Sequence, residues 1–305
     1  MAPYGYTKWR SKMVVGVIGL GNMGRPIAEH LSDVGEKLAL WNRTSKNAEG
    51  ITGSTVQKTP RAVVETANVI ISVLANDAAL TSTYHGPGGI LEADLTGKTI
   101  IELCTTSPST VIALEMAIEA KGGLFLECPV SGNVVPARSG QLMGLAGGKQ
   151  AAFDSAQPLL AKLTRRLEHL GPMGSGAAMK LAVNLPLMVY WSALGEAVNL
   201  AMAQGINPSQ ALDILSDSSG AIGAAKKRMQ PMLKMLVNND AGEVSFSLTN
   251  AIKDIKLMDN LAKTSGGPSG VINAILIKAE AAAADGWSDY DNSLVGLHSH
   301  TKEGS

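Results

Sequence analysis

The sequence predicts an α/β protein in which a doubly wound parallel sheet is followed by an all-α C-terminal domain. Two observations lead to this prediction. Apolar runs of strand length alternate with helical stretches as far as Gly171, and no strand-like run of any length follows that glycine. The 305 residues are also enough for two ordinary domains, each with a core of its own.

The first half of the chain supplies the strands and the helices between them. Its first apolar run, "VVGVI" at residues 14–18, stops at a glycine-rich turn and predicts a buried parallel strand. Further strands are expected at residues 37–41, 69–74, 99–103 and 142–146, with another ending near Cys128. Helices are expected at residues 23–34, 60–65 and 110–121. We assign residues 13–173 to this domain and residues 1–12 to an N-terminal extension.

The sequence changes character after the breaker cluster "GPMGSG" at residues 171–176. Residues 177–204 are nearly free of glycine and predict a helix of about 28 residues, about 42 Å long. Pro186 should bend this helix or remove one hydrogen bond. More helices are expected at residues 209–215, 224–237, 247–264 and 270–285. We assign residues 174–296 to a helical domain joined through the long helix, and residues 297–305 to a tail.

Composition restricts the classes of partner. The 26 basic and 26 acidic side chains give a formal charge of zero, so the chain lacks the electrostatic footprint of a protein that binds nucleic acid or anionic membranes. No continuous apolar run reaches the roughly 18 residues of a membrane span, and the leader lacks the apolar stretch of a signal peptide. Cys104 and Cys128 form neither a disulfide framework nor a zinc spacing, which fits a reducing compartment. We therefore expect cytoplasmic residence, with no nucleic-acid or membrane partner.

A glycine pattern follows the first strand and opens the first helix. Gly19, Gly21 and Gly24 form G-x-G-x-x-G, in which the glycines allow a tight turn, close approach of the backbone to a pyrophosphate, and close helix–sheet packing. The free N–H groups at the helix start favour phosphate. The alternative is a glycine-rich turn without a ligand. We predict a Rossmann-type dinucleotide site that includes Gly19, Leu20, Gly21, Asn22, Met23 and Gly24.

The residues after the second strand indicate which dinucleotide is bound. An acidic residue usually binds the ribose 2′-hydroxyl about 20 residues beyond the glycines, but Asn42, Arg43 and Thr44 stand there instead. A guanidinium can pair with a 2′-phosphate through two parallel hydrogen bonds, and Thr44 adds a hydroxyl donor. The pattern predicts NADP (NADPH) rather than NAD, with a solvated surface arginine as the alternative.

Lys180 and Asn184 are the candidates for chemistry on the substrate. They stand four residues apart in "GSGAAMKLAVN" and so share one face of the long helix. The surrounding residues are apolar, and partial desolvation would lower the pKa of a lysine toward the range useful for acid–base catalysis. The alternative is a lysine whose ammonium group snorkels to the surface. His298 and His300 have a metal-like spacing but no third ligand nearby, so no metal is expected.

Four separated motifs resemble the β-hydroxyacid dehydrogenases, the group that contains 3-hydroxyisobutyrate dehydrogenase and the tartronate semialdehyde and glyoxylate/succinic semialdehyde reductases. The motifs, in the family's order, are "GVIGLGNMG", "ECPVSGNVVPARSGQLMGLAGG", "GSGAAMKLAVN" and "FSLTNAIKDIKL". The resemblance extends over residues 14–295 and implies hydride transfer between a nicotinamide cofactor and a small carboxylate-bearing aldehyde or hydroxyacid. It also implies a homodimer or homotetramer built through the helical domain.

The resemblance assigns roles to individual residues. Lys180 matches the general acid/base, and Asn184 matches the amide that orients substrate and lysine. Ser131 and Gly132 match the motif that anchors the substrate, although without the family they would pass for an ordinary turn. Lys253 matches a lysine near the nicotinamide and the substrate, and alone it would be a surface charge. Thr105 matches a threonine that contacts the cofactor near the nicotinamide ribose, and Leu74 matches a residue that lines the cofactor groove.

Departures from the family's pattern concern the substrate. Cys104 stands where serine is common, Cys128 replaces alanine or glycine, and Asn133 replaces a glycine and adds an amide at the expected carboxylate pocket. We therefore include Asn133 among the substrate-binding candidates. An NADPH-dependent imine reductase is the alternative function, although such enzymes usually carry aspartate or tyrosine where Lys180 stands. A phosphogluconate-type decarboxylase and a catalytically silent binding protein fit the chain less well.

Overall fold

The computed structural model describes residues 13–298, and these fall into two compact units that divide between Lys180 and Leu181. The expected extension, residues 1–12, lies outside the described residues, as does most of the expected tail. The first two residues of that tail are described, and both Leu297 and His298 are buried. We call residues up to Lys180 the nucleotide unit and residues from Leu181 the helical unit.

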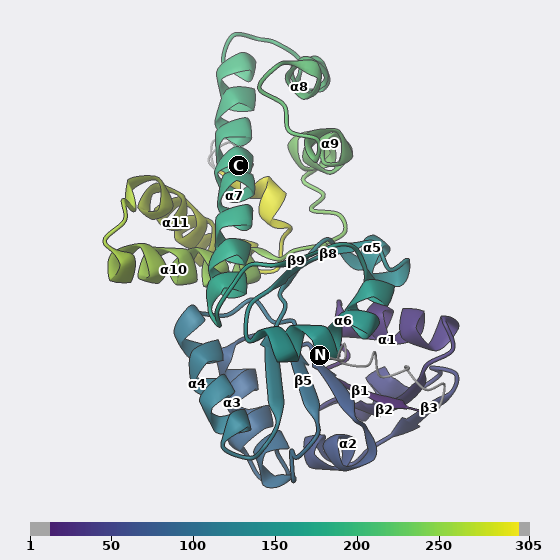
Figure 1. Cartoon of the computed structure of the whole chain (residues 1–305). Helices are drawn as coiled ribbons and strands as arrows, with labels where there is room; N and C mark the ends of the chain where they lie inside the picture. The colour runs from purple at the N-terminus through teal and green to yellow at the C-terminus, as the bar shows by residue number, and fades with distance from the viewer. Residues whose placement is uncertain (1–12, 299–305) are drawn as a thin grey trace. The chain divides into compact units, whose positions relative to one another are not determined.

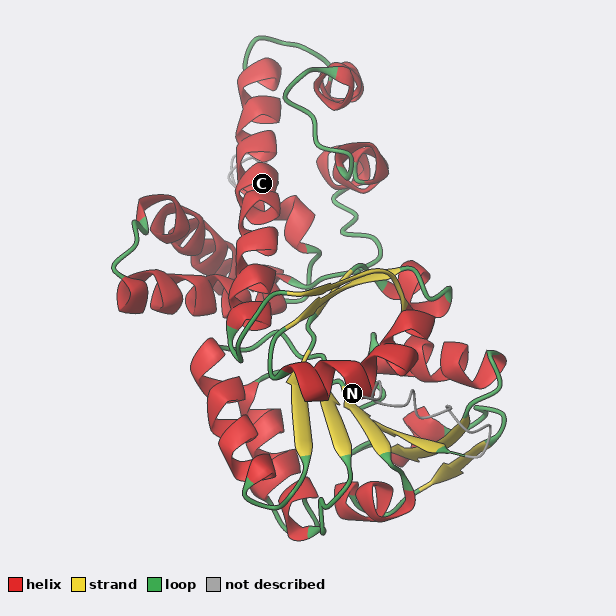
Figure 2. Ribbon diagram, viewed as in Figure 1, coloured by secondary structure: helices red, strands yellow, loops and turns green. Residues whose placement is uncertain are grey.

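A six-stranded, fully parallel sheet forms the centre of the nucleotide unit (Figure 2). Its strands, in spatial order, are β3 (Ser54–Val56), β2 (Lys37–Trp41), β1 (Val14–Ile18), β4 (Val69–Ser72), β5 (Thr99–Glu102) and β6 (Leu124–Glu127). The order reverses between β1 and β4, and the carboxyl ends of strands at such a switch point form the usual nucleotide site. The predicted doubly wound sheet is confirmed. Strand β3 was not predicted because "STV" is too short and polar to stand out.

Helices cover both faces of this sheet (Figure 1). One core contains buried residues of α1 (Gly24–Asp33) and α6 (Gln150–Leu163), and the core on the opposite face contains those of α2 (Pro60–Thr66), α3 (Asp77–His85) and α4 (Pro108–Glu119). Alternation along the strands divides the cores, since Ile101 lies in the first and Ile100 in the second. Helices α2, α3 and α4 each begin after a capping residue whose side chain accepts a backbone N–H of the first turn. The capping residues are Thr59, Asn76 and Ser107, in that order.

A second, smaller sheet follows the main one. It contains β7 (Val130–Ser131), β8 (Leu142–Ala146) and β9 (Thr164–His169), with β7 antiparallel to β8 and β8 parallel to β9. The short helix α5 (Val134–Arg138) connects the first two. The predicted strand at residues 142–146 therefore exists, but it does not belong to the parallel sheet. Strand β9 was missed because "TRRLEH" is mostly charged and carries no apolar run.

The helical unit is built around α7 (Ser175–Met202), which starts in the nucleotide unit and contains Pro186, as the sequence predicted. Four further helices follow: α8 (Pro208–Asp217), α9 (Met229–Asn238), α10 (Leu248–Ser265) and α11 (Gly270–Ala282). A close backbone contact fixes α7 against the 3₁₀ turn Asn292–Leu297, because a Cβ on Gly195 would lie 2.1 Å from the carbonyl carbon of Gly296. No strand is assigned between residues 170 and 298, which matches the expected change of character.

By length and composition alone, α7 could also cross a membrane. Its most apolar 18-residue window has a mean hydropathy of 1.3, and 39% of that window is buried. The average is high although no continuous apolar run is this long, because Lys180, Asn184, Glu196 and Asn199 interrupt the apolar residues of α7. A core helix passes the same test. Since Met188, Leu194 and Val198 of α7 are buried in the core of the helical unit, we assign α7 to that core.

Candidate active site

The glycine loop joins β1 to α1 at the carboxyl edge of the sheet, and the fold itself explains two of its three glycines. Gly19 has φ +91° and a Cβ there would lie 2.2 Å from the carbonyl oxygen of Val73, while a Cβ on Gly24 would lie 1.9 Å from the carbonyl oxygen of Gly19. A Cβ on Gly21 would meet no protein atom within 4 Å. The exposed Gly21 therefore leaves open the space in which a pyrophosphate would approach the backbone, and the loop fits a dinucleotide.

Side chains beyond β2 hold this loop in place. Leu20 donates its N–H to Asn42 Oδ1 (2.8 Å), and its carbonyl accepts a bond from Asn47 Nδ2 (3.2 Å). The side chain of Arg25, on α1, donates to the carbonyls of Asn47 (2.8 Å) and Glu49 (3.2 Å). Asn42 thus fixes the backbone of the glycine loop through its side-chain oxygen. The sequence did not indicate this role.

The residues expected to select the dinucleotide follow β2 directly. Arg43 and Thr44 are both exposed, and the carbonyl of Thr44 accepts a bond from Asn42 Nδ2 (3.0 Å). The guanidinium and hydroxyl groups therefore lie in the loop that Asn42 connects to the glycines. Asn22 is exposed and Met23 half-buried at the start of α1.

Leu74 and Thr105 lie just beyond β4 and β5, the next strands of the same edge, and both are half-buried. The loop that carries Thr105 is connected to α3. Thr106 and Thr110 both donate their hydroxyl protons to the carboxylate of Asp77, the second of these bonds being 3.1 Å long. Asp77 was not singled out from the sequence, because its partners are about 30 residues away.

The expected substrate anchor lies where β7 of the smaller sheet passes into α5. Ser131 ends β7, and Gly132 has φ +138°, with Leu142 and Pro136 so close that a Cβ would lie 2.8 and 3.0 Å from them. Asn133 caps α5, since its Oδ1 accepts the N–H of Val135 at 3.2 Å. The side chain of Asn133 is exposed and already has a structural role.

Lys180 lies in the second turn of α7 with only 8% of its surface exposed. Its neighbour Leu181 is buried, whereas Met179 is 42% exposed and faces away. A buried ammonium group is unusual in a folded protein. Lys180 is therefore largely withdrawn from solvent as a residue, and its catalytic role stays a prediction.

Asn184 and Lys253, both in the helical unit, are brought together by a residue that the sequence analysis did not select. The buried carboxylate of Asp254 accepts a bond from Asn184 Nδ2 (3.1 Å) and lies 3.0 Å from Lys253 Nζ. Asp254 is 2% exposed, so it holds the amide of α7 and the ammonium of α10 at fixed positions. Its position next to Lys253 in "IKDIKL" was the available signal, but it was weak because Lys256 and Asp259 in the same helix are charged as well.

Two buried glutamates occupy paired positions at the carboxyl ends of β5 and β6. Glu102 and Glu127 are each 1% exposed and are register partners. Burial raises the pKa of each carboxyl from its ordinary value of 4.5 to about 7, against hydrogen bonds that lower it. A charged residue that ends an apolar strand run, as in "TIIE" and "LFLE", was the signal for both.

The cysteines and His298 are engaged in packing or in local pairs. Neither cysteine forms a disulfide and both are buried, and burial raises the pKa of the Cys128 thiol to about 12. His298 pairs with Asp285 at 2.6 Å. Among residues 13–298 no group of three or more His, Cys, Asp or Glu side chains is arranged to hold a metal.

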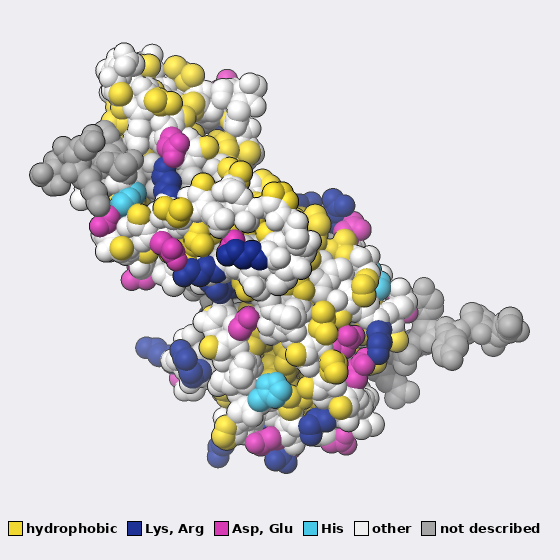
Figure 3. Space-filling view, turned by 90° about the vertical axis from the view of Figure 1, so that its left-hand side faces the viewer, with side chains coloured by type: hydrophobic (Ala, Val, Ile, Leu, Met, Phe, Trp, Pro, Cys, Tyr) yellow, Lys and Arg dark blue, Asp and Glu magenta, His cyan; other side chains and the backbone are white. Residues whose placement is uncertain are grey.

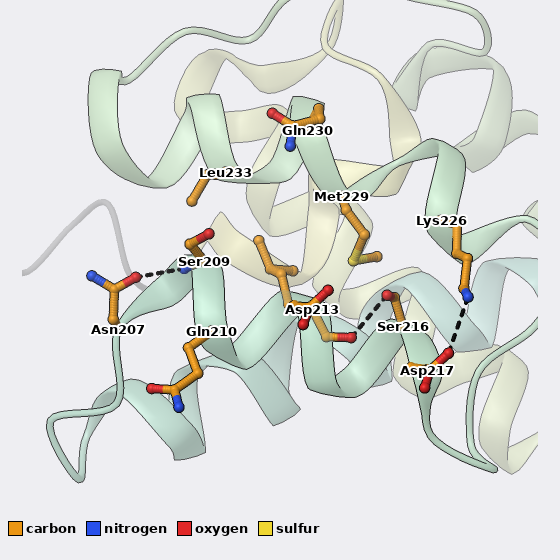
Figure 4. Close-up of a pocket in the computed structure, with 11 residues that line it drawn as sticks. Asn207, Ser209, Gln210, Asp213, Ser216, Asp217, Lys226, Met229, Gln230 and Leu233 are labelled. Atoms are coloured by element: carbon orange, nitrogen blue, oxygen red, sulfur yellow. Dashed lines mark hydrogen bonds and ion pairs between the residues drawn. The ribbon is translucent and has the colours of Figure 1, made fainter.

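A groove of about 800 Å³ lies between α8 and α9 of the helical unit and contains none of the predicted site residues (Figure 4). Several of its polar groups are engaged locally: Lys226 pairs with Asp217 at 3.0 Å, and Ser216 donates to the carbonyl of Asp213 at 2.9 Å. The groove is therefore separate from every residue that the sequence assigned to the cofactor or the substrate.

Comparison with known proteins identifies the family of this chain. Residues 14–174 match the family described as the NAD binding domain of 6-phosphogluconate dehydrogenase, and residues 174–296 match the NAD-binding domain of NADP-dependent 3-hydroxyisobutyrate dehydrogenase. Glyoxylate/succinic semialdehyde reductase 1 of Arabidopsis thaliana is 33% identical over 93% of this chain and 97% of its own length. The chain belongs to the β-hydroxyacid dehydrogenase family. The predicted resemblance is thereby confirmed.

Further relatives and solved structures are consistent with this family. The mitochondrial 3-hydroxyisobutyrate dehydrogenase of Homo sapiens is 32% identical over 85% of this chain and 78% of its own length. A 3-hydroxyisobutyrate dehydrogenase structure from Mycobacterium tuberculosis, with L-serine, has a TM-score of 0.82, 26% identity, and coverage of 94% of this chain and 99% of its own. An imine reductase from Myxococcus stipitatus shares the fold, with a TM-score of 0.62 and 18% identity over 92% of this chain and 98% of its own. Family membership makes this chain an oxidoreductase with a nicotinamide cofactor.

Proposed function

We propose that this chain is an NADPH-dependent reductase that interconverts a small β-hydroxyacid and its semialdehyde or keto form, with Lys180 as general acid/base. The observation that carries the proposal is the burial of Lys180 one helical turn from Asn184, in a chain of this family. The substrates named for the relatives, glyoxylate and succinic semialdehyde, supply the substrate class: an aldehyde next to or near a carboxylate.

In the proposed mechanism each group has one task. Bound NADPH supplies the hydride. Lys180 Nζ gives its proton to the carbonyl oxygen as the carbonyl carbon is reduced, and in the reverse direction it accepts the hydroxyl proton. Asn184 and Lys253, held by Asp254, orient the substrate, while the hydroxyl of Ser131 and the backbone at Gly132 hold its carboxylate.

Two observations support NADPH over NADH. Arg43 and Thr44 stand exposed at the end of β2, where a carboxylate would repel a 2′-phosphate, and Asn42 is neutral. The guanidinium can pair with that phosphate in two parallel hydrogen bonds. The open space at Gly21 fits the pyrophosphate of either dinucleotide.

The test measures the rate of NADPH oxidation, by absorbance, with a panel of substrates. The panel contains glyoxylate, succinic semialdehyde, methylmalonate semialdehyde and a cyclic imine, and each is also assayed with NADH. The proposal expects the highest kcat/KM for one of the three carboxylate-bearing aldehydes with NADPH. A higher kcat/KM for the imine would instead assign the chain to the imine reductases, and preference for NADH would remove the cofactor assignment.

We further propose a homodimer or homotetramer formed through the helical unit. Large apolar side chains of this unit are exposed: Leu187, Leu200, Ile214, Val237, Val271 and Ile277. Covering such side chains stabilises an assembly. Light scattering in solution should give the mass of two or four chains, and a monomer would contradict the assembly.

We also propose that the chain acts in the cytoplasm without a nucleic-acid partner. Basic and acidic side chains are interspersed on the face drawn in Figure 3, so this face presents no extended basic patch. Cys104 and Cys128 are buried thiols outside any disulfide, which suits a reducing compartment.

A further inference from the structure

The first turn of α7 is seated on the carboxylate of Glu127. Glu127 Oε1 accepts the N–H groups of Gly174 (2.6 Å) and Gly176 (3.0 Å), and Oε2 accepts that of Ala177 (2.9 Å). These N–H groups lie at the helix start, where they have no partner within the helix. A carboxylate there is also favoured by the helix dipole.

Two glycines make this seat tight. A Cβ on Gly176 would lie 2.4 Å from the carbonyl oxygen of Leu145, and a Cβ on Gly147 would lie 2.3 Å from Glu127 Oε1. Glu127 and Gly147 also exchange backbone hydrogen bonds of 3.2 and 3.0 Å. The first turn of α7 is thus in contact with the ends of β6 and β8, and it can neither slide nor rotate without breaking these contacts.

Lys180 follows this seat by one turn. It stands four residues after Gly176 and three after Ala177, so it lies on the same side of α7 as the N–H groups that Glu127 binds. Because one turn of helix is stiff, the position of Gly176 and Ala177 determines the position of the Lys180 backbone. All four residues belong to the nucleotide unit.

We propose that Glu127 is a positioning residue for Lys180: by accepting three N–H groups of the first turn of α7, its carboxylate sets where the lysine stands. The inference rests on the proposed role of Lys180 as general acid/base. We assign Glu127 no contact with the substrate, because both of its oxygens bind the start of α7.

The primary test is Glu127→Gln. The carboxamide has nearly the same shape as the carboxylate. If its oxygen still accepts the N–H groups of Gly174 and Gly176, its NH₂ group lies against the N–H of Ala177, and two donors then face each other without an acceptor. We expect kcat to fall about 10- to 100-fold, as for an approximately 1 Å misplacement of a catalytic group, with the KM for NADPH changed less than about twofold. Glu119→Gln is the matched control, because Glu119 is a partly exposed glutamate paired with Lys149 (2.7 Å), and its kcat should stay at the wild-type value. A wild-type kcat in Glu127→Gln would overturn the inference.

A double-mutant cycle separates positioning from general destabilisation. In a Lys180→Ala background, Glu127→Gln should have no further effect on the rate beyond about twofold, because the group that it positions is gone. A second fall in rate as large as the first would overturn the inference. Lys180→Ala alone tests the proposed function: a wild-type rate in that variant would remove the catalytic role of the lysine itself, whatever Glu127 does.

Glu127→Asp keeps the experiment decisive if Glu127→Gln does not fold. It retains the carboxylate but is one methylene shorter, so it can reach only part of the helix start. Its kcat should lie between those of the wild type and the expected Glu127→Gln value, and the same cycle with Lys180→Ala applies. A kcat equal to the wild-type value, or an effect that persists in full without Lys180, would contradict the positioning role.

Discussion

The glycine loop of the nucleotide unit and the Asn184–Lys253 pair of the helical unit are held by different means. In the glycine loop close backbone contacts decide, because carbonyl oxygens lie where a Cβ on Gly19 or Gly24 would stand, while the space beside Gly21 is open. In the helical unit a side chain decides, since the carboxylate of Asp254 contacts both Asn184 and Lys253. The loop should therefore be sensitive to an added Cβ, whereas the pair depends on one buried carboxylate.

In this comparison the largest expected effect concerns cofactor binding at Gly21. Gly21→Ala should leave the melting temperature unchanged, because its methyl group meets no protein atom, but it should raise the Kd for NADPH about 100-fold by filling the pyrophosphate space. Gly24→Ala should weaken NADPH binding and, unlike Gly21→Ala, should also lower the melting temperature, because its Cβ collides with the carbonyl oxygen of Gly19. Gly223→Ala, at an exposed glycine with equally open surroundings, is the control for both measurements. Unchanged NADPH binding in Gly21→Ala would contradict the cofactor assignment.

In the helical unit the corresponding change is Asp254→Asn. It removes the charge that faces Lys253 and leaves a buried amide in its place, so kcat/KM should fall about 10- to 100-fold and the free energy of unfolding by about 1–3 kcal/mol. Steady-state kinetics and urea unfolding measure the two effects. Asp217→Asn, whose ion pair with Lys226 is exposed, should change neither. If Asp254→Asn behaved like this control, the helical unit would not depend on its buried carboxylate.

A smaller and more selective effect is expected for Arg43→Ala. Loss of a charge-assisted pair with the 2′-phosphate should raise the KM for NADPH about 10-fold and leave the KM for NADH unchanged. Arg61→Ala removes an arginine of similar exposure whose ion pair with Glu65 is local, and both constants should keep their wild-type values. Equal changes for the two cofactors in Arg43→Ala would argue for a solvated surface charge.

The smallest effect on activity, and the clearest on stability, is expected for Glu102→Gln. The pKa of Glu102, about 7 in the folded protein against an ordinary 4.5, means that the folded state binds this proton more tightly. Its contribution to stability is complete below about pH 4.5 and is lost as the pH rises through 7; the difference of about 2.5 pKa units corresponds to something on the order of 3 kcal/mol. Glu127 contributes in the same direction.

A glutamine at position 102 stays neutral and keeps its partners, because it can accept the N–H of Cys104 and donate to the Tyr84 hydroxyl oxygen. Urea unfolding of Glu102→Gln between pH 5 and 8.5 should therefore show roughly half the wild-type loss of stability. The same loss in both proteins would contradict the account. Glu127→Gln differs because its partners are three fixed N–H donors, which no neutral amide can all satisfy.

These differences also explain how much the sequence could predict. The glycine motif and strands β1, β2 and β8 depend on neighbours a few residues apart, and their positions were predicted correctly. Asp254 and Asn184 are 70 residues apart, and Glu127 meets α7 across 47 to 50 residues, so no local spacing pairs them. The family resemblance marked Lys180 and Lys253, but it did not indicate which acidic residues fix their positions.

The most direct test of the central claim is a single-turnover measurement of NADPH oxidation in Lys180→Ala, with the preferred aldehyde in excess and NADPH affinity determined in the same samples. The account predicts hydride transfer about 10²- to 10⁴-fold slower than in the wild type, because the variant lacks the proton donor. The Kd for NADPH should be unchanged, because the cofactor loop is intact. Hydride transfer at the wild-type rate would show that the proton comes from elsewhere and would contradict the account.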